Sequence, residues 1–515
     1  MKSVKKNRTT QSVTNVIYGF INQFSTLILA FISRSVFIQV LSVDYLGING
    51  LFTDVLQMLS LADLGFSVAM TYSFYKPLAE KDERKIAGLV HFYKKVYLLV
   101  ALAVSIVGIA IMPFIKYIVK VEQDIPLLEL YYFISLLNVV LSYLFVYKTT
   151  LLVADQKNYV IVRVSIITNL LKTIVQIIVL LLFRNYVIYL LIALISTFLN
   201  NFWASRKADK EYPFLKDKNS VLSEAEKKGI FSNLKSVFIV KISGMLLNAT
   251  DNTFISVLVN TAAVGYYSNY LMINNKVTNI LTTIFTSITA SVGNVVATEN
   301  EDKRYSVFQA LQSASLILCG IIISSYLILI NDLIYVWIGK KFMFDSITVI
   351  VIAFNLYFAC VFQPLWSYRE ATGLYRRTKY VMLIAAIINL ILSFVMGKEW
   401  GLKGILLASI IARVLTYVWY EPIILFREYF NKPVGKYYIS LLGNVFLIFA
   451  SAVGVSVLMR NFVIDDWIPL FIKAFIVGVI NSLVFIVFYI RTEGSKIILD
   501  KFKFIVMKVW KKIAK

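Results

Sequence analysis

The sequence predicts an all-α integral membrane protein with about fourteen transmembrane helices. Of its 515 residues, 59% are hydrophobic and only 16% are charged, whereas soluble domains are about half apolar and a quarter charged. The apolar residues also form near-continuous runs, such as Ile174–Phe183 and Leu316–Ile330. Such runs favour spanning helices of about 20 residues over the short alternating segments of a β-barrel.

Hydropathy divides the chain into fourteen predicted spans joined by short polar segments. We place them at residues 13–40, 46–72, 88–115, 126–151, 158–183, 185–205, 236–260, 263–296, 307–330, 345–367, 379–397, 402–426, 437–459 and 467–490. An even number of spans puts both termini on the same side. We also expect Pro364 and Pro422 to kink the tenth and twelfth spans, because a proline inside a helix removes a backbone hydrogen bond.

The distribution of basic residues predicts on which side of the membrane the two termini lie. If the N-terminus is inside, the predicted inner segments hold 38 of the 52 Lys and Arg residues and the outer segments hold 8. Basic residues collect in cytoplasmic loops, so we expect an N-in, C-in protein. The net charge of +23 then needs no nucleic acid as a partner.

The two halves of the chain look related. A shift of 218 residues lays Ser33 on Asp251, Arg34 on Asn252 and Gly47 on Gly265. A six-span repeat keeps its orientation, which predicts a parallel duplication of the kind found in transporters. The predicted parts are an N-terminal lobe at 1–205, a cytoplasmic linker at 206–235, a C-terminal lobe at 236–430, spans 13 and 14 at 431–490, and a basic amphipathic tail at 491–515 on the inner leaflet.

Polar residues inside the predicted spans are the candidate substrate-binding groups, because charges in a membrane are costly and indicate function. In the first span, the candidates Asn22, Gln23 and Arg34 share one side of the helix with two hydroxyl residues, Thr26 and Ser33. The full set of candidates is Asn22, Gln23, Arg34, Lys241, Asn248, Asp251, Asn252 and Lys276. Two alternatives stay open: amide groups also join helices, and Asp251 could neutralise Lys276 or Arg34 as a structural ion pair.

The balance of charges within the spans favours an anionic substrate. Away from the span ends, the basic residues outnumber the acidic ones. The basic residues are Arg34, Lys172, Lys276, Arg413 and Lys473, and the acidic residues are Asp54, Asp63 and Asp251. An exporter of organic cations is expected to show the reverse.

Enzyme motifs are missing from the sequence. The single histidine is His91, and the two cysteines, Cys319 and Cys360, lie inside apolar runs. This excludes a histidine-based triad and predicts no metal site and no cofactor. There is also no GxxxxGK[ST] loop for ATP, so the expected energy source is an ion gradient (Na⁺ or H⁺), the membrane potential, or substrate supply and removal.

Two stretches carry a family resemblance. Residues Val40–Phe52 (VLSVDYLGINGLF) and Leu61–Phe66 (LADLGF) resemble the first-to-second-span signature of Wzx-type polysaccharide flippases. Residues Asp251–Asn260, followed by Val264–Tyr267, are similar to the second-half counterpart. These proteins belong to the multidrug, oligosaccharidyl-lipid and polysaccharide (MOP) exporter superfamily.

The resemblance implies a two-lobed bundle with a central cavity that works by alternating access in the bacterial cytoplasmic membrane. It implies an undecaprenyl-diphosphate-linked oligosaccharide as substrate, such as a capsule, O-antigen or exopolysaccharide repeat unit, moved from the inner to the outer leaflet. Membrane lipids and other polysaccharide-assembly proteins are the implied partners. A flippase for lipid-linked peptidoglycan precursor and a multidrug exporter of the same superfamily stay open. A membrane enzyme is disfavoured by the short outer loops.

Overall fold

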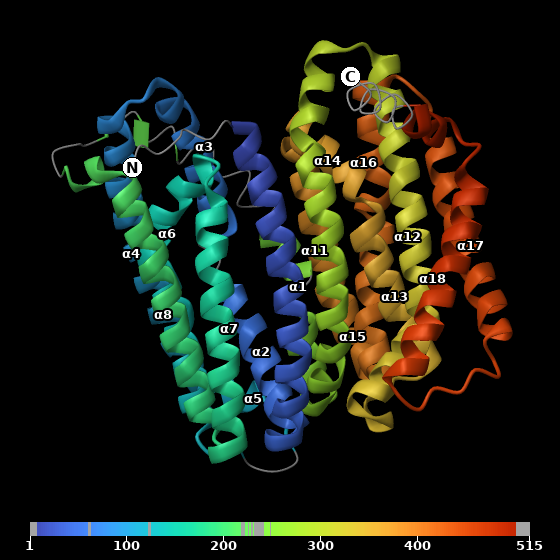
Figure 1. Cartoon of the computed structure of the whole chain (residues 1–515), viewed down its shortest axis with the longest axis horizontal. Coiled ribbons are helices and arrows are strands. Elements are labelled where there is room, and N and C mark those ends of the chain that lie inside the picture. The colour runs from blue at the N-terminus through green and yellow to red at the C-terminus, as the bar shows by residue number, and fades with distance from the viewer. Residues whose placement is uncertain are drawn as a thin grey trace, which may run out of the picture. The chain divides into compact units, whose positions relative to one another are not determined.

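The computed structural model describes residues 8–59, 63–121, 125–217, 222–224, 226–227, 230, 242–247 and 249–500. All the regular secondary structure in these residues is helical, with no strand, as predicted. The chain forms two compact units, residues 1–268 and 269–515. Each unit is a bundle of long helices (Figure 1).

The first unit contains the first half of the chain and the start of α11. Its helices are α1 (Arg8–Leu41), α2 (Val43–Leu59), α3 (Asp63–Glu80), α4 (Glu83–Ile111), α5 (Ile115–Ile118), α6 (Leu128–Ala154), α7 (Asn158–Phe183), α8 (Tyr186–Glu211) and α10 (Asp251–Leu258), with 3₁₀ turns at Met112–Phe114 and Pro213–Lys216. The closest-packed pairs are α6 with α8, α1 with α7, and α4 with α6.

The second unit is built around α12 (Glu301–Ile338), which packs against α13, α17 and α18. It contains most of α11 (Thr261–Thr298), together with α13 (Ser346–Val361), α14 (Gln363–Thr372), α15 (Tyr375–Leu415), α16 (Tyr417–Leu425), α17 (Gly435–Leu458) and α18 (Trp467–Tyr489), a 3₁₀ turn at Lys340–Phe342 and a π-helical turn at Phe426–Phe430. Pro364 lies in the first turn of α14, so the predicted kink is the break between α13 and α14.

Several helices begin at an Asp or Asn whose side chain accepts a hydrogen bond from a backbone N–H of the first turn. Asp82 caps α4 through the N–H of Lys85 at 2.9 Å, and Asn300 caps α12 through that of Lys303 at 3.0 Å. Asn185, Asp345 and Asp466 do the same for α8, α13 and α18. Because such caps satisfy N–H groups that have no partner inside the helix, these local sequences fix where the long apolar helices start.

Eleven helices in the described part of the chain have the length and composition to cross a membrane. One of them, Arg377–Phe430, has 54 residues and covers two predicted spans. Its backbone leaves the helical region at Gly401, with φ 58° and ψ −135°. Asn389 then donates to Ser409 Oγ at 2.8 Å, although twenty residues of continuous helix would span about 30 Å. The chain therefore folds back at Gly401, and α15 consists of two arms.

Two further predicted spans, 46–72 and 236–260, include residues outside the described part of the chain. The count of fourteen spans and the N-in, C-in orientation therefore stay predictions. The predicted linker and tail also lie wholly or partly outside the described residues, and the boundaries of the two lobes stay predictions as well. What the structure establishes is a helical, multi-pass membrane protein.

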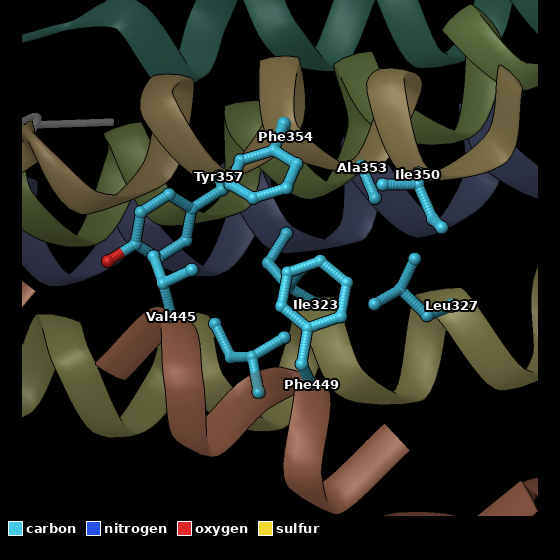
Figure 2. Close-up of a pocket in the computed structure, with 9 residues that line it drawn as sticks. Ile323, Leu327, Ile350, Ala353, Phe354, Tyr357, Val445 and Phe449 are labelled. Atoms are coloured by element: carbon cyan, nitrogen blue, oxygen red, sulfur yellow. The ribbon is translucent and has the colours of Figure 1, made fainter. Parts of the chain in front are cut away.

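A small pocket in the second unit lies between α12, α13 and α17 (Figure 2). Ile323 and Leu327 line it from α12, Phe354 from α13, and Val445 and Phe449 from α17. These side chains are apolar, and the hydroxyl of Tyr357, which also lines the pocket, donates to the carbonyl of Leu441 at 3.5 Å. The pocket is therefore not a candidate site for the predicted ligand.

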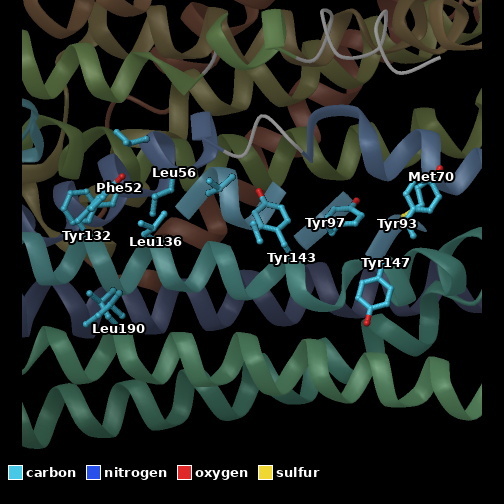
Figure 3. Packing of buried hydrophobic residues seen from close by; sticks show 14 of the residues in the cluster. Phe52, Leu56, Met70, Tyr93, Tyr97, Tyr132, Leu136, Tyr143, Tyr147 and Leu190 are labelled. Atoms are coloured by element: carbon cyan, nitrogen blue, oxygen red, sulfur yellow. The ribbon is translucent and has the colours of Figure 1, made fainter. Parts of the chain in front are cut away.

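Tyrosines are prominent in the core of the first unit, where α4 and α6 pack (Figure 3). Tyr97 stacks on Tyr143 with ring centroids 6.3 Å apart, and Phe52 meets Tyr132 edge to face at 5.4 Å. Aromatic pairs in these geometries add to the free energy gained by burial alone. This core supports α1 and α2, the helices that carry the candidate site.

Candidate functional site

The polar side of α1 is the first part of the candidate site. Asn22, Gln23, Thr26, Ser33 and Arg34 all lie on this one helix, as predicted. Thr26 Oγ1 donates to the carbonyl of Gln23 at 3.1 Å. The Oδ1 atom of Asn22 is buried and accepts no hydrogen bond within the described residues. A buried amide oxygen without a donor is costly, so Asn22 is suited to a ligand or water that donates to it.

Arg34 connects α1 to α11. Its Nη1 donates to Ser268 Oγ at 3.0 Å, and Ser268 Oγ donates to the carbonyl of Gly265 at 2.8 Å. On the other side, Tyr189 of α8 interacts with Ser33 and Arg34. The hydroxyl of Ser268 thus helps to orient the guanidinium, and an anion can compete with this hydroxyl because hydrogen bonds between opposite charges are stronger.

Asn252 makes the corresponding contact in the second half of the repeat. It lies next to Asp251, the first residue of α10, and is only 4% exposed. Its Nδ2 donates to Asp54 Oδ2 of α2 at 2.7 Å. The predicted candidate Asn252 is therefore bound to Asp54, an acidic residue inside the second predicted span.

The α2–α11 crossing, which we define by Val43, Gly47, Thr261 and Gly265, lies beside these bonds. A Cβ atom on Gly47 would collide with the carbonyl oxygen of Thr261, and one on Gly265 would collide with that of Val43. Both pairs obey the 218-residue shift, since Val43 corresponds to Thr261 and Gly47 to Gly265. The two halves therefore meet in a reciprocal contact that requires glycine on each side.

Arg34 and Asn252 also correspond to each other under the 218-residue shift. Arg34 reaches from the first span to α11, and Asn252 reaches from α10 to α2. Two hydrogen bonds between Lys120 and Thr261 hold one end of the crossing. Lys120 N donates to Thr261 Oγ1 at 2.9 Å, and Thr261 N donates to the carbonyl of Lys120 at 2.8 Å. Ser256 Oγ also donates to the carbonyl of Ile118 at 2.7 Å.

Lys276 lies on α11 in the second unit, so the structure does not unite it with Arg34 inside one unit. It is half-buried. The neighbouring residues Asn275 and Asn279 are exposed, as are Thr283 and Thr286 further along the helix. Sequence analysis selected only the lysine and missed this exposed polar face, although the spacing of four, four and three residues was visible in the sequence.

Three other charged residues have protein partners. Lys473 Nζ binds Asp332 Oδ2 at 2.7 Å, and Arg413 Nη1 donates to Asn355 Oδ1 at 3.0 Å. The charge balance in the sequence counted Lys473 as an unmatched cation because Asp332 was placed beyond the end of its span. That interpretation was wrong: Lys473 belongs to an ion pair, and it gives no argument for an anionic substrate.

Lys241 and Asn248, the remaining candidates, lie outside the described residues. Among the residues that are described, no group of three or more His, Cys, Asp or Glu side chains could hold a metal ion. Both cysteines are free and buried. The chemistry of the candidate site is therefore that of guanidinium, ammonium, amide and hydroxyl groups, together with the carboxylates of Asp54 and Asp251.

Comparison with known proteins agrees with this fold. The inward closed conformation of the lipid II flippase MurJ is 14% identical and superposes with a TM-score of 0.66, covering 92% of this chain and 100% of that chain. An inward-facing multidrug resistance MATE family transporter of the MOP superfamily is 11% identical, with a TM-score of 0.57 over 79% of this chain and 97% of its own. The Vibrio cholerae MATE transporter VcmN in the bent form is 10% identical, with a TM-score of 0.54 over 79% of this chain and 94% of its own.

At such low identity these likenesses show the fold alone. No curated protein matches the sequence. A family model described as "Polysaccharide biosynthesis protein" matches residues 12–292, more than half of the chain, and confirms the resemblance predicted from the sequence. The chain is therefore a multi-pass membrane protein with a transporter fold, and it belongs to the polysaccharide biosynthesis protein family.

Proposed function

We propose that this protein is a flippase that moves an undecaprenyl-diphosphate-linked oligosaccharide from the inner to the outer leaflet of the bacterial cytoplasmic membrane. The observation that carries the proposal is Arg34, a half-buried cation on a membrane-crossing helix whose guanidinium donates to the hydroxyl of Ser268. A diphosphate that leaves water needs such a cationic partner. The family match supports a polysaccharide precursor as the substrate class.

In this proposal, binding replaces one set of hydrogen bonds with another. The diphosphate takes the guanidinium of Arg34 away from Ser268, and Asn22 and Gln23 offer amide groups to the adjoining sugar. The energy of the new charge-assisted bonds is available to weaken the contact between α1 and α11. The lipid tail stays in the bilayer throughout.

The α2–α11 crossing serves as the outer gate of an alternating-access cycle. In the predicted topology it lies at the outer ends of the first spans of both halves. Once the substrate has taken Arg34 from Ser268, its release requires the separation of α2 from α11, which also breaks the bond of Asn252 to Asp54. The reciprocal glycines let the helices close completely again after release.

The proposal is tested by flipping in proteoliposomes. Purified protein is reconstituted with a fluorescent undecaprenyl-diphosphate oligosaccharide, and its access from the opposite leaflet is followed for wild type, Arg34→Ala and Arg34→Lys. We expect Arg34→Ala to lower the rate by tenfold or more, because a charged hydrogen bond contributes about 1.5–3 kcal/mol, and Arg34→Lys to retain part of it. Arg460→Ala, at an exposed position after α17, is the matched control and leaves the rate unchanged.

The same vesicles separate the competing functions. A wild-type protein that leaves this substrate in place but moves lipid-linked peptidoglycan precursor, or an organic cation, contradicts the proposal and assigns the corresponding alternative. An Arg34→Ala variant that is folded, inserted and fully active contradicts the role of Arg34.

The gate has its own test. Gly47→Ala pushes a methyl group into the backbone of Thr261, so α2 and α11 cannot close, and we expect transport to fall while the protein still folds. Gly50→Ala is the control on the same helix, because its new Cβ would lie at an ordinary 3.5 Å from Val264 Cγ1. Equal transport rates in the two variants contradict the gate.

A further inference from the structure

One face of α11, in the second unit, carries a series of exposed polar side chains. Asn275, Asn279, Thr283, Thr286 and Asn294 are all exposed. At 3.6 residues per turn they fall within about 100° of arc. Lys276 lies at the edge of the same arc. We call these six residues the α11 track.

The opposite side of α11 is fixed to its own unit. Leu281, Phe285 and Val292 are buried there. Gln363 Nε2 of α14 donates to Thr282 Oγ1 at 3.1 Å, and Ser367 Oγ donates to the carbonyl of Phe285 at 3.3 Å. The rotation of α11 about its axis is therefore set by packing, and the track points away from the core of the unit.

A face of this kind cannot lie against lipid tails. Amide and ammonium groups lose their hydrogen bonds to water in hydrocarbon, and each loss costs several kcal/mol. A transmembrane helix with an exposed polar face therefore borders water or a polar ligand. Asn275 and Asn294 are nineteen residues apart in the sequence, so the α11 track is about 28 Å long, which suits an elongated ligand.

The track has the hydrogen-bonding pattern of a sugar-binding surface. Thr283 Oγ1 donates to the carbonyl of Asn279, and Thr286 Oγ1 to that of Thr282, both at 2.7 Å. These hydroxyl protons are used inside the helix, so the oxygen lone pairs remain as acceptors. The amides of Asn275, Asn279 and Asn294 both donate and accept. Sugar hydroxyls also do both, which makes the two surfaces complementary.

The charged residues of α11 restrict the class of glycan that the track can bind. The 38 residues of α11 include no Asp or Glu, and Lys276 is the only Lys or Arg. An amine-bearing glycan would find no counter-ion here. The single cation at one end of a neutral row matches a ligand with an anionic head followed by neutral hydroxyl groups.

We propose that the α11 track holds the glycan during transport, with the sugar hydroxyls bonded along Asn279, Thr283, Thr286 and Asn294 and the diphosphate at the Lys276 end before it reaches Arg34. This inference rests on the proposed flippase function and adds that the glycan is largely neutral. As the glycan moves along α11, successive amide and hydroxyl groups of the track exchange neutral hydrogen bonds with the sugars. Such bonds do not depend on one kind of sugar, so the track tolerates different sugars.

The test compares two fluorescent substrates in proteoliposomes: undecaprenyl diphosphate that carries a neutral oligosaccharide, and the same lipid with a single sugar. In the double variant Thr283→Val with Thr286→Val, two acceptors are replaced by methyl groups of the same size. We expect about a tenfold slower flipping of the oligosaccharide substrate, from two lost hydrogen bonds, and little change for the single-sugar lipid. Thr149→Val is the control, a half-buried threonine of α6 whose hydroxyl also bonds its own helix.

The outcomes separate the two proposals. Wild type that moves neither lipid overturns the proposed function itself. Wild type that moves both lipids, with an equal slowdown or none in the double variant, overturns only the track. A wild type that moves an amine-bearing oligosaccharide as fast as a neutral one contradicts the assignment of a neutral glycan. Unchanged thermal unfolding of the double variant shows that the loss is not one of folding.

Discussion

Most of α11 lies in the same unit as α18. Both helices are long enough to cross a membrane, yet they place their polar side chains on opposite sides. α11 exposes Asn279 and Thr283 and buries Leu281 and Phe285. α18 does the reverse: Lys473 and Asn481 are buried, and Phe471, Phe475, Leu483 and Val487 are exposed. An apolar exposed face suits lipid, whereas a polar one needs water.

The buried polar groups of α18 join it to α12 and α17. Lys473 binds Asp332 at 2.7 Å. Asn481 donates to Ser325 Oγ at 2.9 Å and accepts from Ser451 Oγ at 2.6 Å. A polar residue in a membrane helix thus has two unrelated uses: in α18 it holds helices together, and in α11 it remains available to a ligand.

The largest expected effect comes from breaking the ion pair of α18. Asp332→Ala leaves the ammonium of Lys473 buried without its carboxylate, and we expect the free energy of unfolding to fall by about 3 kcal/mol. Thermal unfolding in detergent measures it. The double variant Asp332→Ala with Lys473→Leu removes the stranded charge and recovers most of the loss. Asp465→Ala, at an exposed carboxylate, is the control, and an equal loss there contradicts the assignment.

A second test uses the close packing between α12 and α18. A Cβ on Gly320 would overlap the ring of Phe485, so Gly320→Ala should destabilise the protein by about 1–3 kcal/mol, as overpacking does. Gly478→Ala in α18 has open space around the new methyl group and leaves stability unchanged or raises it. If both variants unfold at the same temperature, α18 is not held against α12 in this way.

A smaller effect is expected for an ion pair at the surface of the same unit. Lys403 binds Asp345 at 3.0 Å, with both side chains over 40% exposed. Partial burial opposes ionisation of Asp345, but bonds from Thr348 and Lys403 outweigh it and lower its pKa below the usual value. The stabilisation is therefore present above the ordinary pKa of an aspartate and is lost as the pH falls through the lowered value.

Asp345→Asn should accordingly cost about 0.5 kcal/mol or less at neutral pH, and less still in high salt. The difference from wild type should vanish in acid. A difference that persists at low pH would show that the pair is not the cause.

The smallest expected effect on stability is in α11. Thr286→Val removes an exposed hydroxyl, and we expect the free energy of unfolding to change by no more than about 0.5 kcal/mol, while transport of the oligosaccharide substrate slows. Thermal unfolding and flipping rates of the same preparation give both numbers. A large loss of stability would place Thr286 in a packing role like that of Asn481.

The sequence predicted the helical membrane class, the polar side of α1 and the correspondence of Arg34 with Asn252, because each depends on local spacing or on the repeat. It could not distinguish Lys276 from Lys473. Both are single lysines in apolar helices, and the burial of Lys473 against Asp332 depends on a residue 141 positions away in the sequence. The reciprocal glycines were visible as aligned positions, but their close approach to Thr261 and Val43 is a property of the folded chain.

The most direct test of the central claim, that α11 borders the path of the substrate, is thiol accessibility in proteoliposomes. Asn279→Cys and Phe475→Cys are made in turn and treated with a membrane-impermeant maleimide, with and without undecaprenyl-diphosphate oligosaccharide; the native Cys319 and Cys360 are buried. The account predicts that the cysteine in Asn279→Cys reacts and is protected by the substrate, whereas that in Phe475→Cys is unreactive in lipid. Equal reactivity at the two positions, or no protection of the α11 position, would contradict it.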